Sequence, residues 1–361
     1  MNKKKIAIIG TNGLPANYGG WETLTEYLTK YLSQEFDITV FCTSTAYKEK
    51  KLIHNGAKLK YLSLKANGIQ SIPYDIVSIF KSLFFADTLL ILGVSGCVIL
   101  PFIKLISKKK IAVNIDGLEW KRAKWGKATK WFLKLSEKLA VLNSDVVLTD
   151  NKVIQSYVKD TYGKDSTLVE YGADHCTKLE LGQTVKNDFP FLLDKYAFKV
   201  CRIEPENNIE MILEAFSKTK KLNLVIIGNW DNSEFGKNMR NTFGNFNNIF
   251  LLDPIYDQHI LNQIRSNCYI YIHGHSAGGT NPSLVEAMYL ELGIVAFGVN
   301  FNVATTENRG LYFNDEKELI NIINKLIENK IDIDSYKKGM KEIANRRYQW
   351  SIIADKYAEV F

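Results

Sequence analysis

Apolar positions in this chain follow two alternating patterns. Short apolar runs end in glycine or a polar residue, and in the longer stretches between them apolar residues recur every three or four positions. The first run, 5–10, leads through a glycine-rich turn into 21–34, where Leu24, Leu28 and Leu32 share one helical face. Further runs follow at 38–42, 89–93, 111–116 and 145–150. This alternation predicts a parallel sheet covered by helices on both faces.

The same alternation starts again near Tyr196 and fills the rest of the chain. A helix with one apolar face is expected over 207–219. Strand-like runs lie at 198–203, 222–228, 248–253, 268–275 and 293–298. We therefore predict an α/β protein with two Rossmann-like domains, at residues 1–180 and 195–345, and a last helix within 346–361. The irregular stretch 178–194 is the predicted linker.

Composition and charge fit a globular protein with two cores. The 361 residues are 46% apolar, which is ample for two buried cores. The net charge is +7, and the runs Lys3–Lys5 and Lys108–Lys110 supply much of the excess. Two interpretations stay open, a solvated basic surface or attraction to anionic lipid or a phosphate-bearing substrate. No feature indicates a nucleic-acid partner.

The cysteines and the amino-terminal residues indicate the cellular compartment. The five cysteines are scattered and form no C-x-x-C pair, so neither a disulfide framework nor a zinc site is predicted. The start, MNKKKIAIIG, becomes polar too soon for a secretory signal. A reducing cytoplasm is the expected location.

The stretch 89–106 is largely apolar and is followed by Lys108–Lys110. That pattern resembles a membrane span with a positive flank. Against a span, Gly93 and Gly96 interrupt the stretch, and Pro101 and Lys104 follow. A buried strand with a buried helix, and a helix that also touches a membrane surface, are the other two interpretations.

The strongest local motif is HGHSAGGTNPSLVEAM, residues 273–288. A glycine loop precedes Asn281, a good N-cap, and Pro282, which suits the first helical position. The free amides at such a helix start make an anion site suited to a diphosphate, and Glu286, one turn further, is placed to accept hydrogen bonds from ribose hydroxyls. A capped helix without a ligand is the alternative. The residues assigned to donor binding here are Ser276, Gly278, Gly279, Thr280, Asn281, Ser283 and Glu286.

His273 and His275 occupy alternate positions of a predicted strand and so point to one face. A metal pair needs a third ligand, and none lies nearby in the sequence. We therefore predict no metal site and assign both histidines to the lining of a substrate cleft, with core packing as the alternative.

The amino-terminal loop is rich in glycine, with Gly19 and Gly20 just before the first helix. Glycine at a strand-to-helix junction lets the backbone approach a phosphate or a sugar closely. Both glycines are assigned to donor binding, and Tyr18 and Asp150 to the acceptor or cleft. No acidic residue follows the strand at 38–42, which argues against an NAD enzyme.

Carboxylates follow the predicted strand at 111–116. Asp116 and Glu119 come where α/β sheets place their ligands, so one of them is a candidate to orient an acceptor hydroxyl or take its proton. The aromatic and basic residues of 120–125 fit acceptor or membrane contact. An ordinary turn with surface charges is the alternative.

The segment CRIEPENN, 201–208, offers a cation at a strand end. Arg202 is a candidate partner for donor phosphates. Glu204 and Glu206 are candidates to contact the sugar, Glu206 as a catalytic group, or they are acidic residues that favour a helix start.

Taken together, IGTNGLPANYGGWET, NIDGLEWKRAKW, RIEPENN and HSAGGTNPSLVEAM resemble the bacterial rhamnosyltransferase-type, DUF1972-containing branch of retaining glycosyltransferase family 4. The resemblance spans nearly the whole chain. It implies the GT-B fold, in which two Rossmann-like domains face a central cleft, the first for the acceptor and the second for the nucleotide sugar. It also implies catalysis without a bound metal or other cofactor, and a last helix that returns to the first domain.

The sequence departs from the wider family at two positions. The family carries two glutamates eight positions apart around the phosphate loop; Glu286 matches the second, whereas the first falls on Gly278. The usual lysine after the arginine of the second domain falls on Asn207. Asp116, Glu206 and backbone amides are the expected substitutes.

The resemblance implies transfer of a sugar, L-rhamnose from dTDP-L-rhamnose, to a saccharide or an undecaprenyl-linked saccharide in surface polysaccharide synthesis. It places the protein in the cytoplasm, with attachment to the inner face of the plasma membrane as a further expectation. Two rivals stay open. One is a nucleotide-sugar epimerase of the same fold, and the other is a catalytically silent donor-binding subunit.

Overall fold

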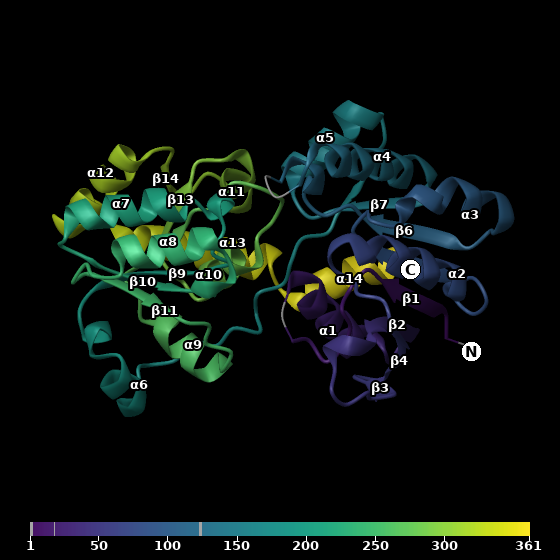
Figure 1. Ribbon diagram of the computed structural model, residues 1–361, viewed down its shortest axis with the longest axis horizontal. Helices are drawn as coiled ribbons and strands as arrows, with labels where there is room; N and C mark the ends of the chain where they lie inside the picture. Colours follow the sequence, from purple (N-terminus) through teal and green to yellow (C-terminus); the bar gives the residue numbers. More distant parts are fainter. Residues whose placement is uncertain (1–2, 18, 123–124) are drawn as a thin grey trace. The chain divides into compact units, whose positions relative to one another are not determined.

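The computed structural model describes residues 3–17, 19–122 and 125–361. The chain forms two α/β units, residues 1–172 with 350–361 and residues 173–349 (Figure 1). The predicted α/β class is therefore confirmed.

The first unit is built on a mostly parallel sheet. Among the described residues its strands follow the order β3-β4-β2-β1-β5-β6-β7-β8, and only β3 and β4 pair antiparallel. The order reverses between β1 and β5, and such a switch point opens a crevice at the carboxyl ends of the strands. The strands are β1 (Lys5–Ile9), β2 (Asp37–Thr43), β3 (Ile53–His54), β4 (Ala57–Leu62), β5 (Thr88–Leu92), β6 (Lys110–Asn114), β7 (Val146–Thr149) and β8 (Thr167–Leu168).

Helices cover this sheet because its central strands are apolar on both faces. The residues of β5 are all buried, as expected for a strand packed on each side. The helices are α1 (Gly20–Leu32), α2 (Ser71–Ser82), α3 (Leu100–Ile106), α4 (Lys127–Asn143), α5 (Lys152–Tyr162) and the last one, α14 (Trp350–Val360). Sequence periodicity did not predict the β3–β4 hairpin, although its two-residue Asn55-Gly56 turn, with positive φ at both residues, is a strong hairpin signal.

The apolar stretch 89–106 becomes strand β5, a glycine turn and the short helix α3. Leu100 and Ile103 pack inward, whereas Phe102, Leu105 and Ile106 remain exposed. Among the described residues no helix combines the length and the apolar character that crossing a bilayer requires. The segment is therefore a strand and a half-buried helix with an apolar outer face.

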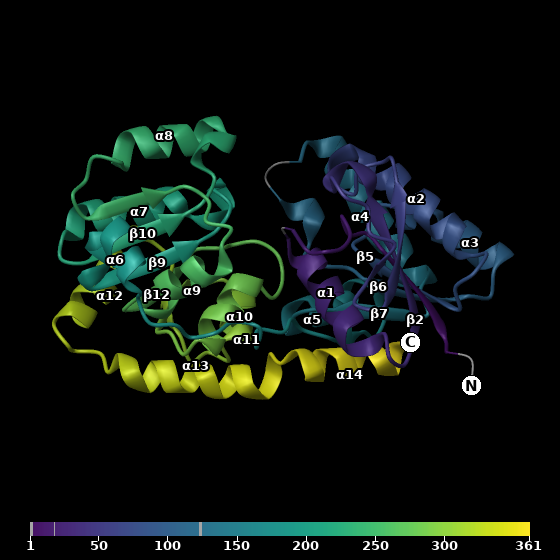
Figure 2. The same ribbon diagram turned by 90° about the horizontal axis from the view of Figure 1, so that it is seen from below.

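The last helix, α14, packs on the first unit along α1 (Figure 2). Trp350 is buried, stacks on Tyr27 with ring centroids 4.5 Å apart, and meets Tyr171 edge-on at 4.9 Å. A side chain at Gly172 would collide with the Trp350 ring. The helix spans Trp350–Val360, within the predicted range 346–361, and helix α13 before it runs on through Arg347.

The second unit has a fully parallel sheet. Its described strands follow the order β11-β10-β9-β12-β13-β14. They are β9 (Tyr196–Val200), β10 (Asn223–Ile227), β11 (Ile249–Leu252), β12 (Ile270–His273), β13 (Ile294–Phe297) and β14 (Leu311–Phe313). The helices are α6 (Gln183–Asp188), α7 (Ile209–Thr219), α8 (Glu234–Phe243), α9 (Gln258–Ser266), α10 (Pro282–Tyr289), α11 (Asn300–Thr305), α12 (Glu316–Ile327) and α13 (Ile333–Arg347). Apolar side chains of α7 and α12 form one core with those of β10 and β12, and α13 lies along α10 (Figure 2).

The predicted linker 178–194 belongs to the second unit. It contains α6, and Gln263 of α9 accepts a hydrogen bond from the backbone N–H of Gly182 at 2.7 Å. The boundary lies at residue 172 rather than 180, because Ala173 already donates its N–H to the carbonyl oxygen of Tyr348. Sequence patterns misplaced it because loop 173–182 has no periodicity of its own.

Candidate functional site

The loop after β12 leads into a well-capped helix. Gly278 adopts φ +94°, a conformation that suits glycine. Asn281 caps α10, as predicted, and its Oδ1 accepts hydrogen bonds from the N–H of Ser283 at 3.1 Å and from the Ser283 hydroxyl at 2.8 Å. Pro282 takes the first helical position. The helix therefore starts at a glycine loop, and a helix start of this kind favours binding of an anion.

This loop is tied to the loop that follows β9. The carbonyl oxygen of Glu206 accepts from both the N–H and the hydroxyl of Ser276, each at 2.9 Å. The side chain of Asn208 donates to the carbonyl oxygen of Gly274 at 2.7 Å. The structure therefore brings 201–208 and 273–283, which lie about 70 residues apart in the sequence, into one site.

Arg202 and Asn207 have different places in this site. Arg202 is exposed, and the nearest approach of its Nη1 to Glu204 Oε1 is 3.9 Å, so its guanidinium is loosely held. Asn207 is buried; it donates to the carbonyl oxygen of Arg202 at 2.8 Å, and its Oδ1 lies 3.1 Å from His275 Nδ1. The asparagine thus joins the two loops, and Arg202 is the exposed cation beside them.

Glu286 lies at the centre of an ion-pair network that the sequence did not reveal. Arg265 of α9 donates from Nη1 to Glu286 Oε2 at 2.7 Å, from Nε to Asn262 at 2.8 Å and from Nη2 to the sulfur of Cys176 at 2.9 Å. On the other side of the carboxylate, Glu286 Oε1 lies 3.3 Å from His175 Nε2. Arg265 and His175 thus hold Glu286 in place from two segments of the second unit, α9 and the loop before α6.

The charges of this network stabilise each other. Burial raises the pKa of Glu286, but Arg265 and His175 outweigh it, so the pKa of this carboxyl lies below its usual value. Burial lowers the pKa of the Arg265 guanidinium, but the negative charge of Glu286 outweighs this effect, so the pKa lies above its usual value. Both groups therefore stay charged at neutral pH.

Three possible metal ligands meet in the same place. The donor atoms of His175, Cys176 and Glu286 lie within 4.8 Å of one another. The Arg265 guanidinium contacts the sulfur and one carboxylate oxygen, and its positive charge opposes a divalent cation there. The cluster is better described as an ion-pair network than as a metal site.

His273 lies inside the unit rather than on the surface of the loop. It is 2% exposed, and neither ring nitrogen has a hydrogen-bond partner among the described residues. Burial, with further contributions from Lys199 and His275, holds the pKa of His273 well below its usual value, so the ring is neutral. This burial supports the packing alternative for His273, whereas His275 lies at the junction of the two loops, with its ring centroid 6.2 Å from that of His273.

The glycine loop of the first unit is organised by Glu22, which sequence reasoning missed. Its carboxylate is buried and accepts hydrogen bonds from the N–H of Asn12 at 2.8 Å and the hydroxyl of Thr11 at 3.4 Å. Burial raises the pKa of Glu22. Gly19 has φ +125°, and a side chain there would collide with the Glu22 carboxylate. The sequence signal that could have identified Glu22 was an acidic residue in the first helical turn, directly after a pair of glycines.

The other candidates of the first unit follow strands of its sheet. Gly20 begins α1, Asp116 follows β6 with φ +62°, and Asp150 follows β7, half-buried. Glu119 is paired with Arg122 at 3.0 Å and accepts from the Trp125 ring N–H at 3.0 Å, so it orders its own loop. Tyr18 lies outside the described residues. Asp116 therefore remains the better placed of the two predicted carboxylates.

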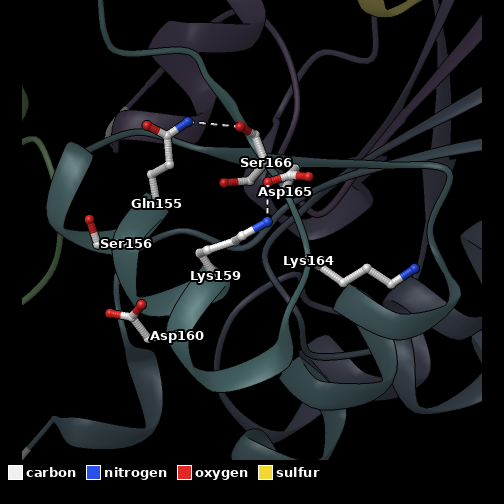
Figure 3. A pocket seen from close by; sticks show the side chains of 7 residues that line it. All are labelled: Gln155, Ser156, Lys159, Asp160, Lys164, Asp165 and Ser166. Atoms are coloured by element: carbon white, nitrogen blue, oxygen red, sulfur yellow. Dashed lines mark hydrogen bonds and ion pairs between the residues drawn. The ribbon is translucent and has the colours of Figure 1, made fainter.

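A surface hollow in the first unit is unrelated to these residues (Figure 3). It is lined by α5 and the loop before β8, and Lys159 pairs with Asp165 across it at 2.7 Å. It lies before the amino end of β8, whereas ligands of parallel α/β sheets bind at the carboxyl ends. Its polar, self-paired lining indicates ordinary surface.

Comparisons with known proteins agree with this geometry. Residues 186–347 match the family described as "Glycosyl transferases group 1", and residues 3–174 match "Domain of unknown function (DUF1972)". A sucrose-phosphate synthase from Thermosynechococcus elongatus has a similar structure, with TM-score 0.81 at 13% identity, covering 99% of this chain and 98% of the other. Anabaena HepE, in complex with UDP, gives TM-score 0.75 at 15% identity, covering 99% and 98%. A putative UDP-N-acetylglucosamine 2-epimerase from Listeria monocytogenes gives TM-score 0.62 at 13% identity, covering 99% and 95%.

These findings define the fold and support a class of protein. The fold is GT-B, as the sequence resemblance implied. The two matched domains together support a nucleotide-sugar glycosyltransferase related to family 4.

Proposed function

We propose that this protein is a retaining glycosyltransferase that moves L-rhamnose from dTDP-L-rhamnose to a saccharide, or to a saccharide linked to an undecaprenyl-type carrier, in surface polysaccharide synthesis. The observation that carries the proposal is the junction of the Arg202 loop with the amino end of α10. The similar Anabaena protein was solved with UDP, which supports a nucleoside diphosphate as part of the donor.

The donor diphosphate would bind at the amino end of α10. Backbone N–H groups near Gly278 and Gly279 and the first turn of the helix supply hydrogen bonds without any side-chain charge. Arg202 supplies the positive charge, and the weak hold of Glu204 leaves it free to turn toward a phosphate. These groups stabilise the negative charge that grows on the diphosphate as the sugar leaves.

Glu286 would bind the ribose. Arg265 and His175 fix its carboxylate, and the side chain keeps part of its surface exposed. A carboxylate oxygen that accepts one hydrogen bond can accept a second. Glu286 therefore acts as a positioned acceptor for a ribose hydroxyl, with its charge held by Arg265.

The reacting sugar needs polar groups of its own, because Gly278 stands where the wider family has a glutamate. In the transfer, the bond from the anomeric carbon to the diphosphate breaks, the acceptor oxygen bonds to that carbon, and the acceptor hydroxyl gives its proton to the Asp116 carboxylate. Glu206 is the proposed sugar contact and Asp116 the proposed acceptor contact. Neither role requires a metal.

Activity is expected to persist without divalent metal. Arg202 and backbone amides take the part that a metal has in other transferases, and the one ligand cluster among the described residues already contains Arg265. Turnover should be the same, within about twofold, in EDTA and in magnesium or manganese. Complete loss in EDTA that manganese or magnesium restores would contradict the proposal.

Arg202→Ala is expected to weaken binding of a nucleoside diphosphate at least tenfold, because a charge-assisted hydrogen bond contributes about 1.5–3 kcal/mol. Titration calorimetry with dTDP and UDP measures the change. Arg309→Ala is a matched control, because Arg309 has the same side-chain exposure of 45%, lies in the same unit and pairs with Glu342 of α13 rather than with a residue of the two loops. Equal affinities for the Arg202 variant and the parent would remove Arg202 from the donor site.

A nucleotide-sugar epimerase is the second candidate. It is favoured by the structural similarity to the putative epimerase from Listeria monocytogenes. The unusual Gly278 and Asn207 keep a donor-binding subunit without activity as a third. The products formed with and without an acceptor distinguish all three.

A further inference from the structure

The positive charge of this protein is concentrated in one stretch of the first unit. Residues 101–143 contain eleven Lys or Arg and three Asp or Glu, so this stretch alone has a net charge of +8, against +7 for the whole chain. Two of the three acids already have partners within the protein. Glu137 is buried and accepts hydrogen bonds from Tyr157 and Tyr162, and Glu119 is paired with Arg122.

Helix α4 turns a basic and apolar side outward. Its exposed residues repeat every three or four positions and so form one stripe along the helix. They are the small Ala128 and five larger residues, Lys127, Trp131, Lys134, Lys138 and Leu142. Trp131 is 69% exposed, whereas tryptophan side chains are on average mostly buried in folded proteins.

Helix α3 packs beside α4 (Figure 1) and also exposes apolar side chains. Leu105 is 85% exposed, and Phe102 and Ile106 are more than half exposed. Phe102 is in ring contact with Phe80 of α2, at 6.3 Å between centroids, and the turn after α2 carries Phe84, 89% exposed. We call these exposed apolar residues and the lysines of α3, α4 and 108–109 the basic apolar face.

We propose that the basic apolar face binds the surface of an anionic phospholipid bilayer. Lysines at a bilayer surface are attracted to acidic headgroups, and tryptophan, leucine and phenylalanine insert among the headgroups and upper acyl chains. A polyanion in water would use the lysines and leave Leu105, Phe84 and Trp131 exposed. The pairing of both kinds of side chain on one face therefore favours a lipid surface.

The structure favours Trp131, rather than the tryptophans of 120–125, for the proposed contact with the bilayer. The ring N–H of Trp120 donates to Glu137 at 3.1 Å and that of Trp125 donates to Glu119 at 3.0 Å, so both rings are held by the protein. Trp131, one element further along the chain, is the exposed one. Ala123 and Lys124 of the same run lie outside the described residues.

The inference extends the proposed function, since a lipid-linked acceptor presents its sugar at the same bilayer surface. Its test needs neither donor nor acceptor. Co-sedimentation of the full-length chain with vesicles of phosphatidylglycerol and phosphatidylcholine, and with phosphatidylcholine alone, is measured at low and high salt. Failure of vesicle binding and failure of sugar transfer are thus separate results.

Two triple variants test the apolar and the charged contributions to vesicle binding separately. Phe84→Ser/Leu105→Ser/Trp131→Ser removes apolar contact, and Lys108→Gln/Lys127→Gln/Lys138→Gln removes charge. At about fivefold per lysine, the charge variant should bind anionic vesicles on the order of 100-fold more weakly. The parent should bind anionic vesicles, release in high salt and leave neutral vesicles largely unbound.

Matched controls replace three exposed apolar residues and three lysines elsewhere. Leu52, Leu193 and Tyr256, which are 78%, 66% and 70% exposed, are changed to serine. Lys48, Lys51 and Lys65, all exposed, are changed to glutamine. Both controls should bind as the parent does, and circular dichroism should show all four variants folded.

Three outcomes would overturn the proposal. They are no vesicle binding by the parent, equal binding to neutral and anionic vesicles at every salt concentration, and equal losses in the control and the face variants. Binding to heparin without binding to vesicles would assign the face to a soluble polyanion instead.

Discussion

Replacing Glu286 by alanine is expected to destabilise the folded protein by about 3–5 kcal/mol, the usual cost of leaving a buried charge without its partner. Arg265 is the charge left behind: its side chain is only 5% exposed, and Glu286 is its one carboxylate contact among the described residues. The measurement is urea unfolding followed by circular dichroism, with comparison of midpoints and slopes.

The control and the rescue make this prediction specific. Glu342→Ala removes the exposed partner of Arg309 and should cost no more than about 1 kcal/mol. Arg265→Met/Glu286→Ala should recover part of the lost stability, because no unpaired charge remains. If Glu286→Ala unfolds at the same urea concentration as the parent, the ion pair does not stabilise the fold.

Because Glu286 also stabilises the fold, its role in donor binding needs a variant other than alanine. An alanine variant would weaken binding through unfolding of the site, whatever the contact with the ribose. Glu286→Gln keeps the shape of the side chain and an acceptor for Arg265. It should lose donor affinity with a smaller loss of stability than the alanine variant.

Replacing Asp75 by asparagine is expected to stabilise the protein by several kcal/mol above pH 8. Asp75 of α2 is buried, its Oδ2 accepts from the N–H of Gly96 at 3.2 Å, and its Oδ1 has no hydrogen-bond partner among the described residues. Burial raises the pKa of Asp75 to about 8, against 3.8 for an ordinary aspartate, and the N–H of Gly96 offsets only part of this. At about 1.4 kcal/mol per pKa unit, ionising this carboxyl inside the fold is costly.

The direction of the pH dependence follows from the raised pKa. Below about pH 4 both the folded and the unfolded chain hold the proton, so Asp75 contributes no slope. Between about pH 4 and pH 8 the unfolded chain has released the proton that the folded protein keeps, so stability falls as the pH rises. Above about pH 8 both states are ionised and the loss is complete.

Urea unfolding of the parent and of Asp75→Asn from pH 4 to pH 9 tests this account. The two curves should converge near pH 4 and separate as the pH rises. Asp165→Asn, which removes a carboxylate that is 90% exposed, is the control and should follow the parent. A constant difference between Asp75→Asn and the parent at every pH would show that Asp75 does not titrate in this way.

The sequence predicted the parts of the fold and the site that depend on local patterns. Apolar runs placed β1, β5 and β12 within a few residues, because buried parallel strands are apolar along their length. The cap at Asn281 and Pro282 was predictable because capping is decided by neighbouring residues. The Arg202 and Asn281 segments were both singled out, but their contact through Ser276 and Glu206 was not.

The parts that escaped prediction depend on long-range contacts. Arg265 lies 21 residues from Glu286 and 89 from Cys176, and nothing in its own helix distinguishes it from a surface arginine. Glu119 looked catalytic because it follows a strand, yet its carboxylate is used by Arg122 and Trp125. Glu22 was passed over because its burial depends on how the glycine loop folds over it.

The most direct test of the proposed function is analysis of the products formed from dTDP-L-rhamnose and from UDP-linked sugars, each with and without saccharide and undecaprenyl-linked acceptors. The transferase account predicts release of nucleoside diphosphate only with an acceptor, and an acceptor heavier by one sugar residue by mass spectrometry. Retention predicts the same anomeric configuration in product and donor by NMR. A donor that changes its configuration without any acceptor, or one that stays intact with every acceptor although it binds, would contradict the account.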